Sequence, residues 1–403
     1  MAARKILIVG ASVAGLSAAE TLRREGFDGQ VILISEEAHL PYDRPPLSKQ
    51  ILQHSMLPEG ASLREPSHYN DLRLDLRLGA AATGLDVIKR QISVGEAAVE
   101  YDSCLIAVGV RPKPLPGINA MKGVHALRTL DDAIRLREEL RPSRSVVVVG
   151  GGFIGLEVAA SARTLGADVT VVEPLAAPLA RVLGTEIGTR VADLHRRRGV
   201  RLICGTSVTG VVGSDYVEHV RLDDGTRIPA DVVVVGVGSL PNVEWLQSSE
   251  IKLDNGVLCD EFCETSVSNV FAAGDVARWR DGVSGHRVRV EHWTNAVEQG
   301  RVAALNMISS AQHPPTAYRH IPYFWSDQYD TKIQFAGRWT DNDELCLRED
   351  PDNRRLLGLL GDGDVLTGVV TFNWARQAAF FRRRMAQGTS WSDAVALARD
   401  GST

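Results

Sequence analysis

The stretch Val146-Val147-Val148-Val149-Gly150-Gly151-Gly152-Phe153-Ile154-Gly155 decides the fold of this chain. Four consecutive valines are typical of a strand that is buried on both faces of a parallel sheet. The glycines keep the spacing of a dinucleotide turn: the first makes the tight turn, the second lets the backbone approach a pyrophosphate, and the third lets the helix pack on its strand. A further strand at residues 169–172 ends at Glu173, where an acid binds ribose in such folds. The stretch therefore predicts a Rossmann-like unit.

The same plan occurs near the N-terminus. A strand at residues 6–9 leads into Gly10-Ala11-Ser12-Val13-Ala14-Gly15, a helical stretch, a strand at 31–34 and Glu36. Ser12 takes the middle position, where its β-carbon narrows the approach to a phosphate. Residues 101–112 and 230–241 also repeat, because both read Asp, apolar strand, glycine turn, proline. The chain is internally duplicated, and we predict that it holds two dinucleotides.

The order of elements predicts the domain organisation. We expect an α/β fold with two doubly wound Rossmann-like dinucleotide-binding domains, arranged on the glutathione-reductase-like plan, and a small α+β C-terminal domain. The Pro-rich connector at 111–117 ends the first domain, and aromatic, alternating segments after Pro322 indicate an antiparallel sheet. The predicted boundaries are 1–113 and 251–318 for the first domain, 114–250 for the second and 319–403 for the third.

Composition narrows the class of protein. The 403 residues include 44% hydrophobic and 24% charged residues, which is typical of a globular protein. A net charge of −5 argues against nucleic-acid binding, which needs a concentrated basic surface. No apolar run approaches the roughly 20 residues of a membrane helix, and the first strand follows the start of the chain at once. We expect a cytoplasmic protein with no membrane partner and no metal site.

Several motifs together resemble one enzyme family. They are residues 40–49 (Leu-Pro-Tyr-Asp-Arg-Pro-Pro-Leu-Ser-Lys), 127–130, 150–157 and 324–329, together with the Gly274-Asp275 turn. In order and spacing, the whole chain is similar to the NADH-dependent ferredoxin reductases of aromatic dioxygenase and cytochrome P450 systems, which are flavoproteins. The resemblance implies FAD in the first domain, NADH in the second, and a [2Fe–2S] ferredoxin as electron acceptor.

The resemblance also implies binding residues, position by position. Those expected to contact FAD are Gly10, Ser12, Val13, Ala14, Gly15, Glu36, Arg44, Lys49, Ala82, Ala107, Gly109, Arg128, Gly274, Asp275, His292 and Trp293. Those expected to contact NADH are Gly150, Gly152, Phe153, Ile154, Gly155, Glu157, Glu173, Arg181 and Gly238, together with Glu291 and Trp325. The carboxylate of Glu173 would repel a 2′-phosphate, so we expect NADH to be preferred over NADPH.

Lys49 and Glu157 are the predicted catalytic pair. The resemblance places them at the flavin, where a fixed ammonium would stabilise the anionic reduced ring and a carboxylate would hold that ammonium in place. On sequence physics alone, Lys49 also reads as a solvated lysine after a Pro-rich turn, and Glu157 as an acid that stabilises the start of a helix.

Arginines are the candidates for docking the acidic ferredoxin. Arg301, in the helical pattern after the Gly274-Asp275 turn, is the best single candidate, because docking arginines in related reductases occupy a matching place. The basic runs at 196–198 and 382–384 are weaker candidates, because most charge runs are solvated faces.

Two other functions remain open. A rubredoxin reductase or another NADH:acceptor flavin oxidoreductase on the same fold would differ only in its acceptor. An NADH-sensing interaction protein of the apoptosis-inducing-factor type is expected to carry a targeting extension and a basic surface. The cysteines argue against disulfide chemistry, because the first of the five is Cys104 and no Cys-x-x-Cys occurs.

Overall fold

The computed structural model describes residues 4–115, 121–281, 285–350, 352 and 354–400. Residues 116 and 117 of the Pro-rich connector lie outside this part. Contacts divide the chain into two compact units, which are described separately. The first consists of residues 1–43, 61–111 and 239–322, and the second of residues 44–60, 112–238 and 323–403. These units follow contacts, whereas the three domain boundaries stay predictions.

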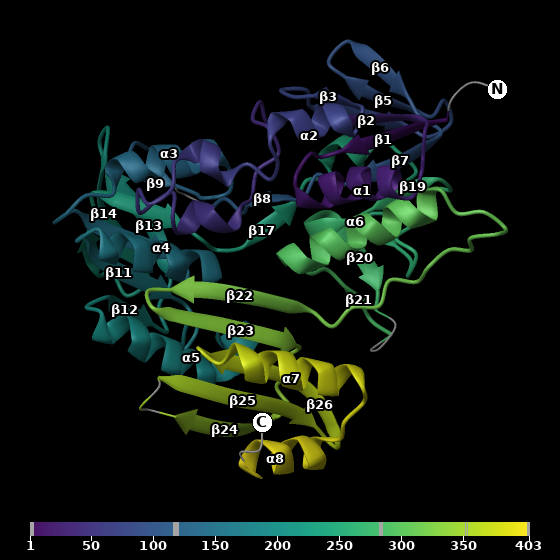
Figure 1. Cartoon of the computed structure of the whole chain (residues 1–403). Coiled ribbons are helices and arrows are strands. Elements are labelled where there is room, and N and C mark those ends of the chain that lie inside the picture. The colour runs from purple at the N-terminus through teal and green to yellow at the C-terminus, as the bar shows by residue number, and fades with distance from the viewer. Residues whose placement is uncertain (1–3, 116–120, 282–284, 351, 353, 401–403) are drawn as a thin grey trace. The chain divides into compact units, whose positions relative to one another are not determined.

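The first unit is built on a parallel sheet in the order β19-β7-β1-β2-β3. Strand β1 (Lys5–Val9) lies at its centre, and the side chains of Ile6, Leu7 and Ile8 are fully buried because both faces of the sheet are covered. Helices α1 (Val13–Arg24) and α6 (Trp293–Met307) pack against each other (Figure 1). Gly300 of α6 permits this, because a β-carbon there would lie 2.3 Å from the Ala14 carbonyl oxygen.

The other elements of the first unit are shorter. They are β2 (Gln30–Ile34), α2 (Pro66–Asp71), β3 (Leu74–Arg77), β4 (Ala82–Asp86), β5 (Gln91–Val94), β6 (Ala97–Glu100), β7 (Ser103–Ile106), β18 (Val257–Cys259), β19 (Val270–Ala272), β20 (Ala277–Arg280) and β21 (Arg287–Val288). Strands β8 (Val110–Pro112) and β17 (Ser239–Pro241) lie where the chain passes from one unit to the other. Strands β4, β5 and β6 form an antiparallel sheet inserted between β3 and β7.

The second unit repeats this spatial order of strands, although its edge strand β9 precedes the central strand in the sequence, whereas β19 follows β7. Its parallel sheet has the order β12-β11-β10-β16-β9, and an antiparallel sheet of β13, β14 and β15 is inserted between β12 and β16. The central strand β10 (Ser145–Val149) leads into α4 (Phe153–Thr164), as β1 leads into α1. The predicted internal duplication is therefore present in the fold.

The remaining elements of this part are β9 (Val124–His125), α3 (Leu130–Glu139), β11 (Asp168–Glu173), α5 (Ala180–Arg197), β12 (Arg201–Cys204), β13 (Val208–Gly213), β14 (Val217–Leu222), β15 (Arg227–Pro229) and β16 (Val232–Val235).

The C-terminal part of the second unit is an antiparallel sheet, as predicted. Its order is β22-β23-β26-β25-β24, and it carries two helices (Figure 1). The elements are β22 (Tyr323–Gln328), β23 (Thr331–Gly337), β24 (Glu344–Asp350), β25 (Arg355–Asp362), β26 (Val365–Phe372), α7 (Ala375–Ala386) and α8 (Trp391–Asp400). Strand β22 alternates strictly, so Phe324, Ser326 and Gln328 are buried on one face. The predicted fold class is confirmed: two Rossmann-like domains and a small C-terminal α+β domain.

Candidate functional site

The first glycine loop is held tightly against its own sheet. Gly10 has φ +111°, and a β-carbon there would lie 2.2 Å from the carbonyl oxygen of Ala107, in the turn after β7. A β-carbon on Gly15 would lie 2.0 Å from the Gly10 carbonyl oxygen. Distances below 3.0 Å are not tolerated by real β-carbons, so both glycines are required by the fold.

The second loop has the same two tight glycines and one that is different. Gly150 has φ +104°, and a β-carbon there would lie 2.3 Å from the Gly236 carbonyl oxygen. A β-carbon on Gly155 would lie 2.3 Å from the Gly150 carbonyl oxygen. Gly152, in contrast, has φ −77°, and nothing lies within 4 Å of its would-be β-carbon. The fold does not need a glycine there, but the empty space fits a pyrophosphate. Ser12 has nearly the same backbone, with φ −80°, so the serine is unstrained.

The N-termini of α1 and α4 lack caps from the protein. Ser12 and Gly152 are their N-cap residues, neither forms a side-chain cap, and neither helix has an acid in its first turn. By contrast, Thr129 and Asp132 close a full capping box on α3. The exposed amides of a helix start bind phosphate. Both glycine loops therefore fit a dinucleotide, as the sequence predicts.

The two acids predicted to bind ribose differ in their surroundings. Glu173 is buried, and its carboxylate accepts hydrogen bonds from Gly151 N–H at 2.6 Å and from Leu175 N–H at 2.9 Å. The Glu173 carboxylate therefore holds the backbone of the second glycine loop in place through the Gly151 N–H. Glu36, at the matching point of the first unit, is exposed. Binding of ribose by either acid stays a prediction.

The Gly274-Asp275 turn follows β19 in the first unit. Gly274 has φ +77°, and its N–H donates to the side-chain oxygen of Gln299 at 2.9 Å. The amide nitrogen of Gln299 is buried and has no hydrogen-bond partner among the described residues. A donor left over at this turn fits a polar group of a bound cofactor, which supports the predicted FAD position. Sequence reasoning missed Gln299, because a glutamine in a helical pattern carries no signal of its own.

The other predicted residues of the first unit lie at the start of α6 and in the turns and strands of the unit. Trp293 opens the helix, and its indole N–H donates to Asp43 at 2.7 Å. Glu291 pairs with Arg289 at 2.6 Å and accepts a hydrogen bond from Ser239. Burial lowers the pKa of His292 to about 4, so this residue is neutral at pH 7. Ala82 begins β4, Ala107 is buried against Gly10, and Gly109 has φ +65°.

Lys49 and Glu157 form a buried ion pair in the second unit. The Lys49 Nζ lies 2.6 Å from Glu157 Oε2, and the two side chains are only 10% and 8% exposed. Ser48 donates to the same oxygen at 2.5 Å, and Ser326 of β22 donates to Oε1 at 2.6 Å. The structure thus brings the two residues together, which excludes the solvated-lysine interpretation of Lys49. Ser48 and Ser326 were not predicted, although both lie inside the quoted motifs.

Helix α4 holds the segment that carries Lys49. The hydroxyl of Ser161 donates to the Ser48 carbonyl at 2.7 Å, and Gln53 donates to the Ser161 oxygen at 2.9 Å. Glu157 and Ser161 lie one turn apart on α4, so the same helix face binds the Lys49 ammonium and the backbone of the preceding residue, Ser48. The ammonium of Lys49 is therefore held in one place.

The remaining predicted residues of the second unit lie in different environments. Arg44 donates to the Arg128 carbonyl at 2.6 Å. Phe153 packs edge-on against Phe324 with ring centroids 4.4 Å apart. Ile154 and Arg181 are exposed, Trp325 is half-buried, and Gly238 has φ +108° with open space around its would-be β-carbon.

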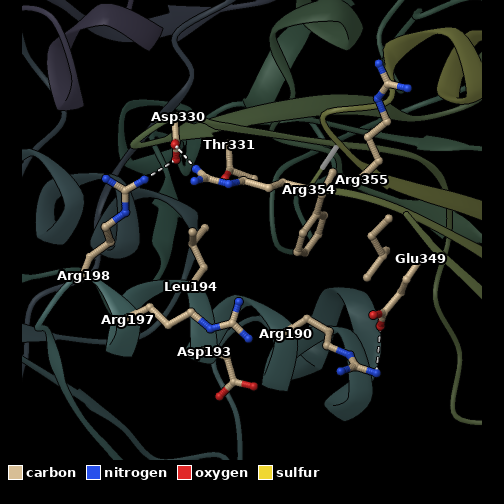
Figure 2. Close-up of a pocket in the computed structure, with 12 residues that line it drawn as sticks. Arg190, Asp193, Leu194, Arg197, Arg198, Asp330, Thr331, Glu349, Arg354 and Arg355 are labelled. Carbon is tan, nitrogen blue, oxygen red and sulfur yellow. Dashed lines mark hydrogen bonds and ion pairs between the residues drawn. The ribbon is translucent and has the colours of Figure 1, made fainter. Parts of the chain in front are cut away.

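Two residues of the basic run at 196–198, Arg197 and Arg198, line a cavity of about 790 Å³ (Figure 2). Its lining includes five arginines: Arg190, Arg197, Arg198, Arg354 and Arg355. Arg198 and Arg354 both pair with Asp330, at 2.5 and 2.8 Å, and Arg190 pairs with Glu349 at 2.9 Å. Two carboxylates therefore compensate two of these three positive charges within the protein.

The other docking candidates are also located. Arg301 is exposed on α6. In the run at 382–384, Arg382 lies over the Tyr323 ring and Arg384 over the Phe380 ring, at 4.9 and 5.1 Å from the centroids. These cation–π contacts tie two of the three arginines to their own unit.

All five cysteines are free thiols. Cys104, Cys259 and Cys263 are buried, and burial raises the pKa of each. A raised pKa suppresses the reactive thiolate. In the part of the chain that the structure describes, no helix is both long and apolar enough to cross a bilayer.

Comparison with known proteins identifies the family. Residues 4–300 match the pyridine nucleotide-disulphide oxidoreductase family, and this match covers more than half of the chain. The chain belongs to this family. Residues 323–402 match a second family, described as the reductase C-terminal domain.

Whole-length relatives narrow the resemblance. The chain is 37% identical to the ferredoxin–NAD(+) reductase component of the anthranilate 1,2-dioxygenase system of Burkholderia cepacia, over 96% of this chain and 95% of the relative. It is 36% identical to rhodocoxin reductase of Rhodococcus erythropolis, over 94% and 89%. Putidaredoxin reductase, solved in covalent complex with putidaredoxin, has a similar structure with a TM-score of 0.91, 32% identity, and coverage of 96% and 94%. The predicted resemblance to ferredoxin reductases is confirmed.

Proposed function

We propose that this chain is an NADH-dependent flavoprotein ferredoxin reductase. It passes electrons from NADH, through FAD, to a [2Fe–2S] ferredoxin that serves a cytochrome P450 or a ring-hydroxylating dioxygenase. The observation that carries this proposal is the pair of uncapped glycine loops, one in each unit. It is supported by the similarity, over nearly the whole chain, to a ferredoxin–NAD(+) reductase component and to putidaredoxin reductase.

The cofactors follow from the two loops. The loop at Gly10, with the Gly274-Asp275 turn in the same unit, is the proposed FAD site, and the loop at Gly150 is the proposed NADH site. When bound, FAD would supply the conversion of a two-electron hydride transfer into single-electron steps to an iron–sulfur protein. We keep NADH over NADPH as a proposal, because Glu173 places a buried carboxylate directly under the second loop.

The protein's own groups position the reaction and control charge. The ammonium of Lys49 is a fixed positive charge in a site with little water, and such a charge stabilises an anion formed next to it. Glu157 keeps that ammonium in place, and two serine hydroxyls keep the carboxylate in place. We retain the prediction that this pair acts at the bound FAD.

Thiol chemistry takes no part in the proposed reaction. The first cysteine of the chain, Cys104, is fully buried in β7, so no reactive thiol lies in the N-terminal part of the first unit. Free thiols throughout the chain favour a reducing compartment, and we propose the cytoplasm.

Steady-state kinetics tests the function. The purified protein is assayed for NADH-driven reduction of cytochrome c, with and without an added [2Fe–2S] ferredoxin. We expect bound FAD, a rate that depends on the ferredoxin, and a higher kcat/KM with NADH than with NADPH. A rate that no [2Fe–2S] ferredoxin raises, but that a rubredoxin raises, would favour rubredoxin reductase.

Arg301→Glu tests the docking side of the proposal. We expect a several-fold lower kcat/KM for the ferredoxin and a weaker salt dependence, because a charge that steers an acidic partner is reversed. Reduction of ferricyanide, a small acceptor, stays at the wild-type rate. The control is Arg227→Glu, which reverses an exposed charge on β15, outside every candidate docking run.

A further inference from the structure

A continuous chain of hydrogen bonds runs through the second unit and ends at Glu157. Tyr329 OH lies 3.2 Å from His195 Nδ1, His195 Nε2 lies 2.8 Å from Gln328 Oε1, and Gln328 Nε2 lies 3.1 Å from Ser326 Oγ. Ser326 then donates to Glu157 at 2.6 Å. His195, Gln328 and Ser326 are 0% exposed, so the chain has no access to water at its centre.

The chemistry of the donors fixes which group donates and which accepts in each of these hydrogen bonds. A serine hydroxyl carries a single hydrogen. Because ionised Glu157 only accepts, Ser326 must give its hydrogen to the carboxylate and must itself accept from the Gln328 NH₂ group. The oxygen of Gln328 then faces His195, so His195 must carry a proton on Nε2, and the ring is neutral when its Nδ1 accepts the hydrogen of the Tyr329 hydroxyl.

The opposite direction would change the charge of Glu157. If the Gln328 amide were reversed, its oxygen would accept the Ser326 hydrogen, and Ser326 would have none left to donate. Glu157 could then bond to Ser326 only by becoming protonated, and Lys49 would lose its counter-charge. Amide orientation at Gln328, the tautomer of His195 and the charge of Glu157 are therefore linked.

We propose that His195 and Gln328 are positioning residues that hold the Glu157 carboxylate ionised and correctly oriented, and through it hold the ammonium of Lys49. Neither residue contacts Lys49 directly, so both act through Ser326 and Glu157. Burial favours the same state, since it lowers the pKa of His195 to about 4. The kinetic consequence rests on the proposed function, whereas the protonation state of His195 does not.

The first measurement is independent of activity. ¹⁵N NMR of protein labelled at histidine reports which ring nitrogen carries the proton, and the His195→Gln variant assigns the signal by its loss. We expect the neutral Nε2–H form at pH 7. A proton on Nδ1, or a charged ring, would overturn the proposal whether or not the protein reduces ferredoxin.

The second measurement separates binding from chemistry. Reduction of the bound flavin by NADH is followed by stopped-flow absorbance, which gives the limiting rate and the NADH dissociation constant. We expect Gln328→Leu to lower the limiting rate about tenfold with an unchanged dissociation constant, which is the size of the lost hydrogen bond between Gln328 and the Ser326 hydroxyl. His195→Leu acts in the same direction, and His195→Gln, which still donates to Gln328, keeps a near wild-type rate.

Controls keep the outcomes distinct. Thr371→Val removes another fully buried hydroxyl of the same unit, one that has no hydrogen-bond partner among the described residues, and it leaves the rate unchanged. A folded, FAD-loaded Gln328→Leu protein with the wild-type limiting rate would overturn the proposal. If Gln328→Leu does not fold, Gln328→Glu tests the same link, because a carboxylate at 328 takes the Ser326 hydrogen away from Glu157 and must lower the rate. A wild-type protein that NADH does not reduce refutes the proposed function alone.

Discussion

The buried pair of Lys49 and Glu157 makes a quantitative prediction about stability. Replacing Glu157 by leucine leaves the Lys49 ammonium, whose side chain is only 10% exposed, without its counter-charge, and leaves the hydroxyls of Ser48 and Ser326 without their acceptor. Removing one partner of a buried pair costs about 3–5 kcal/mol, so we expect the free energy of unfolding to fall by that amount. The double variant Lys49→Met/Glu157→Leu removes both charges and recovers much of the loss.

A double-mutant cycle measures this coupling. Unfolding by urea is followed by far-ultraviolet circular dichroism and by tryptophan fluorescence, whose coincidence tests the two-state assumption. We expect the two single losses to exceed the double loss by at least about 2 kcal/mol. If Glu157→Leu costs less than about 1 kcal/mol, as for an exposed pair, or if the single effects simply add, the assignment of a buried ionic pair is wrong.

Three further perturbations follow from the same structure. Gly152→Ala should keep the melting temperature but raise KM for NADH severalfold, because the open space above the loop is filled, whereas Gly150→Ala should unfold the unit through its clash at 2.3 Å. Thiol titration of the native protein should detect Cys204 and Cys346 only, and all five thiols after denaturation, because the other three are buried and burial raises the pKa of Cys259, for example, to about 12. The lowered pKa of His195 means that the unfolded chain binds more protons between pH 6.5 and about 4, so stability falls as pH drops through this window. His195→Gln removes the contribution of this residue to the pH dependence of the free energy of unfolding, about 3 kcal/mol by linkage. Urea unfolding at a series of pH values should therefore show a smaller loss of stability in acid for the variant than for the wild type. An equal loss in both proteins would contradict a neutral buried histidine.

Much of the fold was predictable because its signals are local. Four consecutive valines, a glycine turn and a closing acid all lie within 30 residues of one another, and their repetition predicts the duplicated sheets. The close approach of Gly10 to Ala107 and of Gly150 to Gly236 explains why the glycines are needed, and it is a contact between segments that sequence spacing does not reveal.

The site was predictable only in part. Lys49 and Glu157 were predicted from a family resemblance, since nothing local distinguishes them from a solvated lysine and a helix acid. The pairing of Gln328 with His195 could not be predicted from the sequence, because it joins a strand of the C-terminal sheet to a helix residue 133 positions earlier. An alternating strand pattern places Gln328 on the buried face, but it does not identify the buried partner.

The two inserted antiparallel sheets show where this fold accommodates added chain. Each occupies the same crossover of its parallel sheet, β4–β6 between β3 and β7 in one unit and β13–β15 between β12 and β16 in the other. The crossover to the next parallel strand therefore accommodates a folded antiparallel insertion in both units, as connections at the surface generally do, and the insertion leaves the order of the parallel strands beside it unchanged.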